Sequence, residues 1–280
     1  MRLDKRLAEL LGARVIGISP LGGGSIATVR RCDLADGRAV VAKTGSAGLV
    51  CEARMLRYLK DHTALPVPEV IHAEDDLLIL EYCDNDARLG GKGESDAARH
   101  VAALHAHLGP GYGFAWETRI GPLPQSNAWG DDWPTFFAGQ RLFPMARACR
   151  DAGGIDGAAL RRVEALIPRL HGLLPARPPP SLLHGDLWGG NILSLKGRVT
   201  GFIDPALYFG DAEMDLAFIT LFASVGAAFF NAYQSLHPIE PGFFEERRDL
   251  YNLWPLLVHA RLFGGGYGAQ AATILARFTS

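Results

Sequence analysis

The chain has 280 residues, and its 28 basic and 30 acidic side chains give a net charge of −2 without segregated charge blocks. This balance excludes the basic surface expected of a general nucleic-acid binder or a membrane-surface binder. With 48% apolar and 21% charged residues, the composition is that of an ordinary soluble globular protein, so intrinsic disorder and a disulfide scaffold are disfavoured.

The sequence indicates no redox or zinc centre, and it favours neither secretion nor insertion into a membrane. The scattered cysteines form no C-x-x-C pair: Cys32, Cys51, Cys83 and Cys149. The first seven residues mix charges with leucines and lack the apolar stretch of a secretory signal. Residues 216–239 contain no charged side chain, but polar residues interrupt the apolar run and it ends at Pro238, which favours a buried helix over a membrane span. We therefore expect a cytoplasmic protein.

The first third of the chain reads as strands with one helix among them. After a short opening helix, residues 21–29 predict a glycine turn that enters a strand, and residues 38–43 predict the next strand. A helical pattern then runs from Ser46 to about Lys60, and Glu52 falls within its apolar stripe. A carboxylate on a core face needs a cation, and Lys43 at the preceding strand is the candidate.

A lobe boundary is predicted near residues 82–86. The apolar strand 77–82 ends there in a polar turn, and long helical patterns follow, including 96–108 and a pattern at 159–174 that Pro168 interrupts. We expect an α+β protein with a small lobe (residues 1–83), made of an antiparallel sheet and a helix. A larger, mainly helical lobe (84–280) follows.

The residues typical of phosphoryl transfer lie in the second half. Residues 181–193 place His184, Asp186 and Asn191 in an H-x-D-x₄-N pattern between two strand-like runs, and the strand 199–203 delivers Asp204. In such a site one carboxylate accepts the proton of the attacking hydroxyl, while an Asn and a second Asp hold Mg²⁺ on the nucleotide phosphates.

The upstream parts occur in the chain order of a bilobal, protein-kinase-like enzyme. A glycine turn at Gly22, Gly23 and Gly24 precedes Lys43 and Glu52, and the hinge and catalytic loop follow. Taken singly, the glycines could form an ordinary hairpin, and Lys43 could be a solvated charge at a strand end.

Polar residues around the catalytic loop have structural interpretations. We expect His184 to brace the loop by hydrogen bonding, Asp211 to cap a helix, and Asp215 to accept hydrogen bonds from catalytic-loop amides. The histidines of the 96–108 helix lack a metal-ligand set and are read as surface or capping residues: His100, His105 and His107.

Four segments together resemble the fructosamine kinase (ketosamine kinase) family, within the aminoglycoside phosphotransferase-like kinases. These are 182–191 (LLHGDLWGGN), 203–217 (IDPALYFGDAEMDLA), 127–142 (an N-x-W…W…FF…QRL pattern) and 256–265 (LLVHARLFGG). The resemblance covers nearly the whole chain. It implies ATP- and Mg²⁺-dependent phosphorylation of a sugar hydroxyl on a ketosamine, a glycated amine, in a protein-repair role.

The resemblance also implies roles for single residues. Asp186 is the expected base, Asn191 and Asp204 the metal ligands, and Lys43 with Glu52 the pair that anchors the phosphates. The glycine loop, with Ser25 where some relatives have a cysteine, and the hinge backbone from Glu81 to Cys83 are expected to bind the nucleotide. Two further departures are Gly189, where a serine is usual, and Ala212, where a basic residue is common.

The acceptor side is less determined. Trp188 is the candidate platform for the sugar; the alternative is that its ring only packs the loop. His259 and Arg261 either face the acceptor, or cap their helix or pair with an acidic neighbour. An aminoglycoside- or choline-type kinase is the alternative; polycationic acceptors would need convergent carboxylates, for which 131–132 and 245–246 are available. A nucleotide-binding pseudokinase is the third reading. We expect a monomer or weak dimer whose partner is a small or protein-linked ketosamine.

Overall fold

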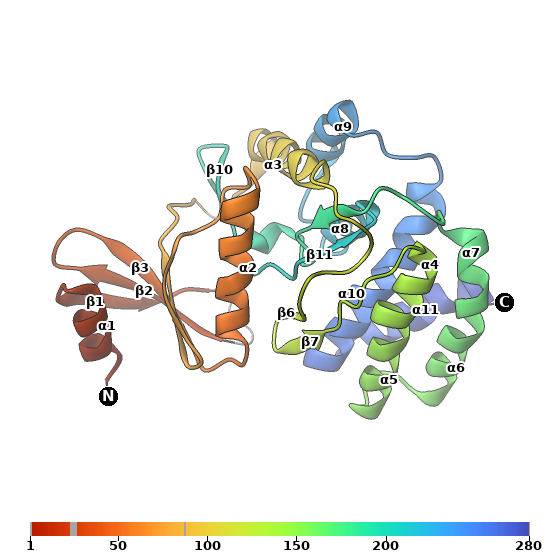
Figure 1. Cartoon of the computed structure of the whole chain (residues 1–280), viewed down its shortest axis with the longest axis horizontal. Coiled ribbons are helices and arrows are strands. Elements are labelled where there is room, and N and C mark those ends of the chain that lie inside the picture. The colour runs from red at the N-terminus through yellow and green to blue at the C-terminus, as the bar shows by residue number, and fades with distance from the viewer. Residues whose placement is uncertain (1, 23–26, 87, 280) are drawn as a thin grey trace.

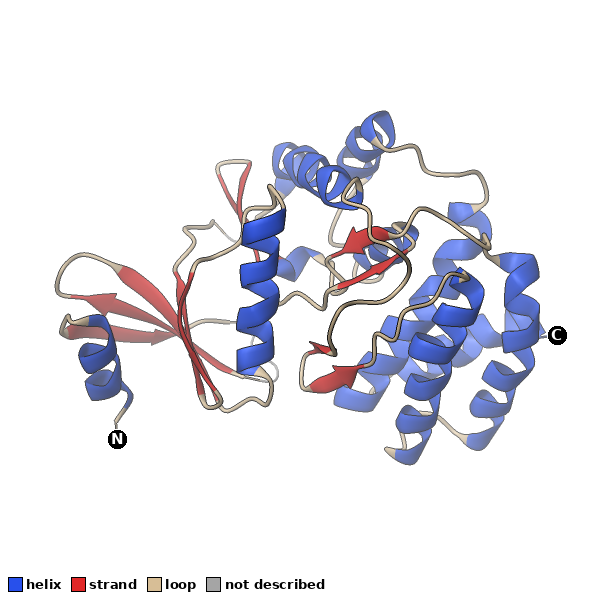
Figure 2. Ribbon diagram, viewed as in Figure 1, coloured by secondary structure: helices blue, strands red, loops and turns tan. Residues whose placement is uncertain are grey.

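The computed structural model of the chain describes residues 2–22, 27–86 and 88–279, arranged as a sheet-containing lobe beside a larger helical lobe (Figures 1 and 2). The small lobe holds one five-stranded antiparallel sheet in the order β1-β2-β3-β5-β4. Its elements are α1 (Leu3–Leu11), β1 (Val15–Pro20), β2 (Thr28–Leu34), β3 (Ala39–Thr44), α2 (Leu49–His62), β4 (Val70–Glu74) and β5 (Leu77–Glu81).

The small-lobe sheet is covered on both faces, which explains why residues 77–80 of β5 are all apolar. Leu77 and Ile79 of β5 join Leu7 of α1 in one core cluster. Leu78 and Leu80, which point to the opposite face, join the apolar stripe of α2 in another. The stripe predicted for this helix is thus confirmed. The helix begins at Leu49 rather than at Ser46, because the chain turns through positive φ at Gly48.

The large lobe is mainly helical, with short paired strands among its helices.

 The strands form three antiparallel pairs (β6 with β7, β8 with β11, β9 with β10), and isolated bridges join Leu108 to Ser181, Tyr112 to Gly130 and Gly113 to Phe209. The strands are β6 (Thr118–Ile120), β7 (Leu123–Gln125), β8 (Ser181–Leu183), β9 (Ile192–Leu195), β10 (Arg198–Phe202) and β11 (Tyr208–Gly210).

Helices surround these short strands and form one continuous apolar core with them (Figure 2). The α-helices of this lobe are α3 (Gly90–His105), α4 (Trp133–Phe136), α5 (Phe143–Asp151), α6 (Gly157–Leu166), α7 (Leu170–Leu173), α8 (Glu213–Thr220), α9 (Ala227–Leu236), α10 (Arg248–Phe263) and α11 (Tyr267–Thr279). Two π-helical turns, Phe137–Leu142 and Phe243–Arg247, and two 3₁₀ turns, Ile167–Arg169 and Gly189–Asn191, complete the list.

Two sequence predictions about these helices need correction. The helix expected over 96–108 begins earlier, at Gly90, and ends at His105. The uncharged segment 216–239 forms two helices, α8 and α9, rather than one, because the chain leaves the helix after Thr220 and adopts a positive φ at Ala223. The interruption predicted at Pro168 is present as a 3₁₀ turn. Among the described residues, no helix is long and apolar enough to cross a membrane.

The two lobes are joined by backbone hydrogen bonds as well as by the chain itself. Phe202 N, at the end of β10, donates to Pro66 O in the small lobe over 2.8 Å. Asp86 N, in the segment that connects the lobes, donates to Ser194 O of β9 over 2.9 Å. These bonds fix the small lobe against the strands that lead into Asp204.

Candidate active site

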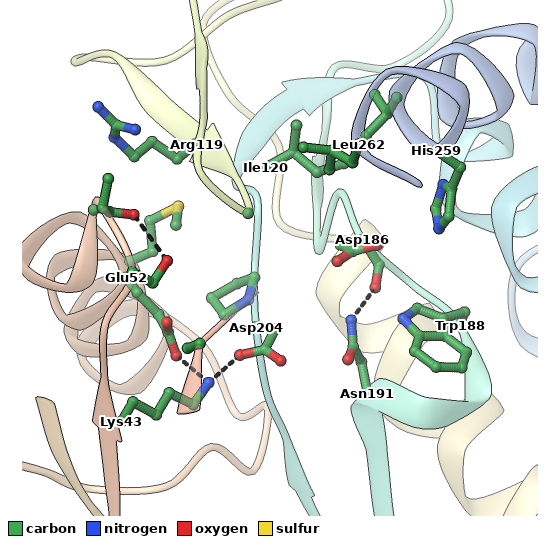
Figure 3. A pocket seen from close by; sticks show the side chains of 18 of the residues that line it. Lys43, Glu52, Arg119, Ile120, Asp186, Trp188, Asn191, Asp204, His259 and Leu262 are labelled. Atoms are coloured by element: carbon green, nitrogen blue, oxygen red, sulfur yellow. Dashed lines mark hydrogen bonds and ion pairs between the residues drawn. The ribbon is translucent and has the colours of Figure 1, made fainter. Parts of the chain in front are cut away.

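A cavity of about 500 Å³ lies between the lobes and brings together the predicted base, the predicted metal ligands, the lysine–glutamate pair, Trp188 and His259 (Figure 3). The small lobe contributes Val29, Lys43 and Glu52 among others. The large lobe contributes the catalytic-loop and metal-loop residues and an aromatic wall: Asp186, Trp188, Asn191, Asp204, Phe222, His259, Phe263 and Tyr267. The polar groups predicted from distant parts of the sequence therefore face one space.

Lys43 is held by two carboxylates from different lobes. Its Nζ lies 2.7 Å from Oε1 of Glu52 on α2 and also forms an ion pair with Asp204. Burial alone would lower the pKa of Lys43, but Asp204 and Glu52 hold it above its ordinary value. The cation expected for Glu52 is thus the strand lysine, whose position on β3 is fixed by pairing with β2 and β5.

The two carboxylates beside Lys43 differ in their electrostatics. Burial raises the pKa of Glu52 to about 7, although the ammonium group opposes this shift. For Asp204 burial also disfavours the charge, but Lys43 lowers its pKa overall. Asp204 therefore remains an anion that faces the cavity. Its backbone has a φ of 55°, an uncommon value for a residue other than glycine, and such strain is typical of functional sites.

Asp186 and Asn191 lie on the opposite side of the cavity from Lys43 (Figure 3). Nδ2 of Asn191 donates to the main-chain oxygen of Asp186 over 2.8 Å, which ties the two ends of the catalytic loop together. Burial, and then the neighbouring Asp204 carboxylate, raise the pKa of Asp186 to about 7. A carboxyl group with such a pKa can exchange a proton near neutral pH, as a general base must.

Asp215 accepts hydrogen bonds from the backbone of the catalytic loop, as predicted. Oδ2 of Asp215 accepts from His184 N over 2.7 Å, and Oδ1 accepts from Gly185 N over 2.9 Å. The N-cap position of α8 is Ala212 rather than the predicted Asp211, but Asp211, one residue earlier, still accepts from the first helical amide, Glu213 N, over 3.0 Å. His184 is fully buried, and its Nδ1 accepts a long hydrogen bond, 3.4 Å, from Asp186 N, so it braces the loop as expected.

The prediction for His105 is wrong. This residue is neither a surface nor a capping histidine: it is fully buried. Its Nδ1 lies 2.7 Å from the Tyr233 hydroxyl and its Nε2 lies 3.2 Å from Oδ2 of Asp215. The sequence offered no signal for this position, because a histidine on an amphipathic helix identifies neither its depth nor partners that are more than 100 positions away.

An aromatic wall stands beside Asp186. The Trp188 ring meets Phe222 at 5.4 Å between centroids, and the Phe222 and Tyr267 rings each lie 5.1 Å from the His259 ring. Nδ1 of His259 is bonded to Pro255 O over 2.8 Å, which leaves Nε2 for the cavity. Burial lowers the pKa of His259, so the ring is neutral at pH 7. The wall is apolar with one polar edge.

Close packing explains the two glycines that follow Trp188. A Cβ built on Gly190 would lie 2.2 Å from the Trp188 ring, so this ring rests directly on the loop backbone. A Cβ on Gly189 would lie 2.5 Å from Cβ of Ser224, whose hydroxyl accepts from Gly189 N over 2.9 Å. A serine at position 189 would therefore fit only if Ser224 moved.

Several predicted residues lie outside the cavity lining. Arg261 is two positions from His259 on α10, and it lies near Cys149 rather than with the aromatic wall. Glu81 and Cys83 are hinge residues that do not line this cavity, and Gly22 does not line it either. Gly23, Gly24 and Ser25 are outside the described residues.

Sequence reasoning missed Arg119, Ile120, Phe222 and Tyr267, which line the cavity. Arg119 and Ile120 come from the β6–β7 hairpin, a short pair whose position between the lobes follows only from tertiary contacts. Phe222 and Tyr267 lie just after α8 and at the start of α11, and their sequence neighbourhoods look like ordinary apolar helices.

The oxygen atoms suitable for a divalent cation are those of Asp204 and Asn191. Because Asn191 uses Nδ2 for its bond to the loop, its amide oxygen is left without that task, and Asn191 and Asp204 line the same cavity. One carboxylate and one amide oxygen suit Mg²⁺, which usually completes its shell with water and substrate phosphates. No cluster of three His, Cys, Asp or Glu ligands occurs within the part of the chain that the structure describes. The donor set therefore fits a metal that arrives with the nucleotide.

Comparison with known proteins agrees with this geometry. A family model described as fructosamine kinase matches residues 5–280. A probable ketoamine kinase from Synechocystis sp. is 41% identical over 206 residues, which cover 71% of this chain and 66% of that protein. A chloroplastic protein-ribulosamine 3-kinase from Oryza sativa subsp. japonica is 33% identical over 282 residues, or 96% of this chain and 80% of that protein.

Solved structures give the same result for the fold. The crystal structure of a candidate fructosamine-3-kinase from Thermobifida fusca has a TM-score of 0.86 and 32% identity, covering 98% of each chain. The aminoglycoside phosphotransferase APH(4)-Ia, solved with ADP and hygromycin B, has a TM-score of 0.68 at 20% identity and shares the fold. The predicted α+β, bilobal kinase-like fold is thus confirmed, and the chain belongs to the fructosamine kinase family of phosphotransferases.

Proposed function

We propose that this chain transfers the γ-phosphoryl group of ATP to a sugar hydroxyl of a ketosamine. Asp186 accepts the proton of the attacking hydroxyl, and Lys43, fixed by Glu52, contacts the nucleotide phosphates. The observation that carries the proposal is the position of Asp186. Its carboxyl group, with a pKa raised to about 7 by burial and by Asp204, faces the same cavity as the Lys43 ion pair and the aromatic wall.

Asp204 and Asn191 would hold Mg²⁺ when the nucleotide binds. The ion neutralises the negative charge that the phosphates carry through the reaction. The Asp204 carboxylate forms an ion pair with Lys43 in the cavity, so this carboxylate has a cationic partner before any metal binds. The chain's own contribution is to keep this carboxylate charged in the cavity that Asn191 also lines.

The aromatic wall supports a sugar acceptor. Rings such as Trp188 pack against the apolar faces of sugars, and the neutral Nε2 of His259 can hydrogen-bond a hydroxyl without adding charge. Relatives of this chain carry the names ketoamine kinase and protein-ribulosamine 3-kinase, so a fructosamine- or ribulosamine-type acceptor, free or linked to protein, is the class we propose.

A polycationic aminoglycoside acceptor finds less support. The acidic pairs considered for it are engaged elsewhere: Asp132 caps α4 and pairs with His171, while Asp131 lies on the exposed surface near Arg177. Glu245 and Glu246 are exposed in the π-helical turn before α10, and neither lines the cavity. The described acidic residues of the cavity are the three beside the reacting groups: Glu52, Asp186 and Asp204.

Product analysis tests the proposal. The purified chain is incubated with Mg·ATP and separate acceptors (fructosyl-, ribulosyl- and erythrulosyl-amines, an aminoglycoside and choline), and NMR determines the position of any phosphate. We expect phosphate on a sugar hydroxyl of the ketosamines. Turnover of the aminoglycoside or choline alone would contradict the acceptor class, and ATP binding without any phosphorylated product would identify a pseudokinase.

A further inference from the structure

A buried polar network runs from Arg141 to the metal-binding loop. Arg141, Asn127, Thr118 and Gln125 are all nearly inaccessible to solvent, between 0% and 5% exposed. Asn127 and Arg141 belong to the N-x-W…QRL segment, to which the proposed reaction assigns no task. Burying so many polar groups is costly unless each finds a partner, so the bonds that they make indicate what they hold in place.

The network begins at a cation without a carboxylate partner among the described residues. The Arg141 guanidinium donates to Ser126 O over 2.7 Å and to Oδ1 of Asn127 over 2.6 Å, and it stacks 3.9 Å from the centre of the Tyr208 ring. A π-helical turn, Phe137–Leu142, presents it, and such turns frequently occur at functional sites. Arg141 thus orients the Asn127 amide.

Asn127 passes this orientation to the hairpin β6–β7. Its Nδ2 donates to Oγ1 of Thr118 over 2.8 Å, and the Thr118 hydroxyl in turn donates to Leu207 O over 2.9 Å. Nε2 of Gln125, which pairs with Thr118 across the hairpin, donates to Ala206 O over 3.1 Å. The network therefore ends on two successive carbonyl groups of the segment that follows Asp204.

Ala206 is where the metal-binding and catalytic loops meet. Its N–H donates to His184 O over 2.7 Å, and its carbonyl oxygen presses on Gly185, where an added Cβ would lie only 2.1 Å away. Asp204 lies two positions before Ala206, and Asp186 lies two positions after His184. The backbone of Ala206 therefore fixes the distance between the loop of the proposed metal ligand and the loop of the proposed base.

We propose that Arg141, Asn127, Thr118 and Gln125 form a positioning network that sets the place of Asp204 relative to Asp186. None of the four is a catalytic residue, since they act through the backbone of Ala206 and Leu207. The inference rests on the proposed function, because it assigns these residues a task in the same reaction. Small displacements of reacting groups lower the reaction rate strongly, so a rigid support of this kind has a kinetic role.

The variant Thr118→Val tests the network, because it keeps the shape and removes the hydroxyl that links Asn127 to Leu207. We expect the Mg²⁺-dependent gain in ADP affinity, measured by calorimetry, and kcat each to fall roughly 10- to 100-fold, while KM for the acceptor is unchanged. Thr118→Ser, which restores the hydroxyl, should recover both. The matched control is Tyr112→Phe, which removes another hydroxyl-to-carbonyl bond of this lobe, to Pro178 O, and should change neither.

The outcomes separate this inference from the proposed function. If Thr118→Val binds Mg·ADP and turns over like Tyr112→Phe, the network only stabilises the fold and the inference is wrong. Should Thr118→Val not fold, Gln125→Met decides in the same assays, because it keeps the side-chain length and loses the bond to Ala206 O. If the wild-type chain phosphorylates no ketosamine but binds ADP more tightly with Mg²⁺, the function fails while the calorimetric test still applies.

Discussion

Lys43 and Asp204, which are 161 positions apart in the sequence, form an ion pair across the cleft between the lobes. The pair brings the β3 lysine of the small lobe directly onto the proposed metal ligand of the large lobe. Since Glu52 holds the same ammonium group, a single cation organises two carboxylates. We expect the charges of these three groups to govern how tightly the cleft binds a nucleotide that carries Mg²⁺.

Replacing Asp204 with Ala should remove the magnesium dependence of nucleotide binding, because Asn191 alone gives Mg²⁺ a single protein oxygen. Calorimetric titrations of ADP with and without Mg²⁺ measure this directly. The control is Asp33→Asn, which alters a half-buried carboxylate paired with Arg31 on the small lobe, outside the cavity. An Asp204→Ala chain whose ADP affinity still rises with Mg²⁺ would show that the ligand lies elsewhere.

Replacing Asp186 with Asn should lower kcat roughly 10²- to 10⁴-fold with the fold intact, as expected for loss of a positioned base. Steady-state kinetics with a ketosamine acceptor, together with circular dichroism, provide the measurement. The amide keeps the size of the side chain, so a loss of structure is not expected. Full activity in this variant contradicts the assigned role.

The rate should depend on pH near neutrality. Burial and Asp204 raise the pKa of Asp186 to about 7, and the base works only when it is deprotonated. We therefore expect kcat/KM to fall as pH is lowered through about 7, with the fall absent from the residual activity of Asp186→Asn. A wild-type profile that stays level down to pH 5 would be inconsistent with Asp186 as the titrating base.

Stability should show the opposite trend. Because the pKa of Asp186 is raised from 3.8 to about 7 on folding, the folded state binds more protons than the unfolded chain. The resulting stabilisation is complete below the unfolded pKa and is lost as pH rises through about 7. Asp186→Asn, which carries no charge, should therefore have a higher Tm than wild type at pH 8. Thermal unfolding at pH 8 and pH 5 tests this, and a lower Tm of the variant at pH 8 counts against it.

Replacing Gly190 with Ala should displace the Trp188 ring, because the new methyl group would lie 2.2 Å from it. We expect KM for the ketosamine to rise more than KM for ATP, since the ring belongs to the acceptor wall. Gly172→Ala, in α7 with open space around its Cα, is the matched control. Equal effects of the two substitutions on acceptor KM would show that Trp188 only packs the loop.

The parts predictable from sequence were those set by local patterns. The apolar stripe of α2 located Glu52, and the spacing from His184 to Asn191 located the catalytic loop, because both depend on neighbours a few residues apart. The carboxylate of Asp215 could also be assigned to the loop amides.

The parts that escaped prediction depend on long-range packing. His105 meets Asp215 from 110 positions away, and the hairpin that carries Arg119 has no pattern that places it between the lobes. The break between α8 and α9 follows from a backbone turn at Ala223, where the residue type gives no warning. Depth and partners of polar side chains are tertiary properties.

The backbone bond from Phe202 to Pro66 ties the small lobe to the strand that ends two residues before Asp204, and the bond from Asp86 to Ser194 holds the connecting segment to the neighbouring strand. Any opening of the cleft that keeps both bonds must turn the small lobe about this edge. We therefore expect nucleotide exchange to widen the cleft least beside Asp204.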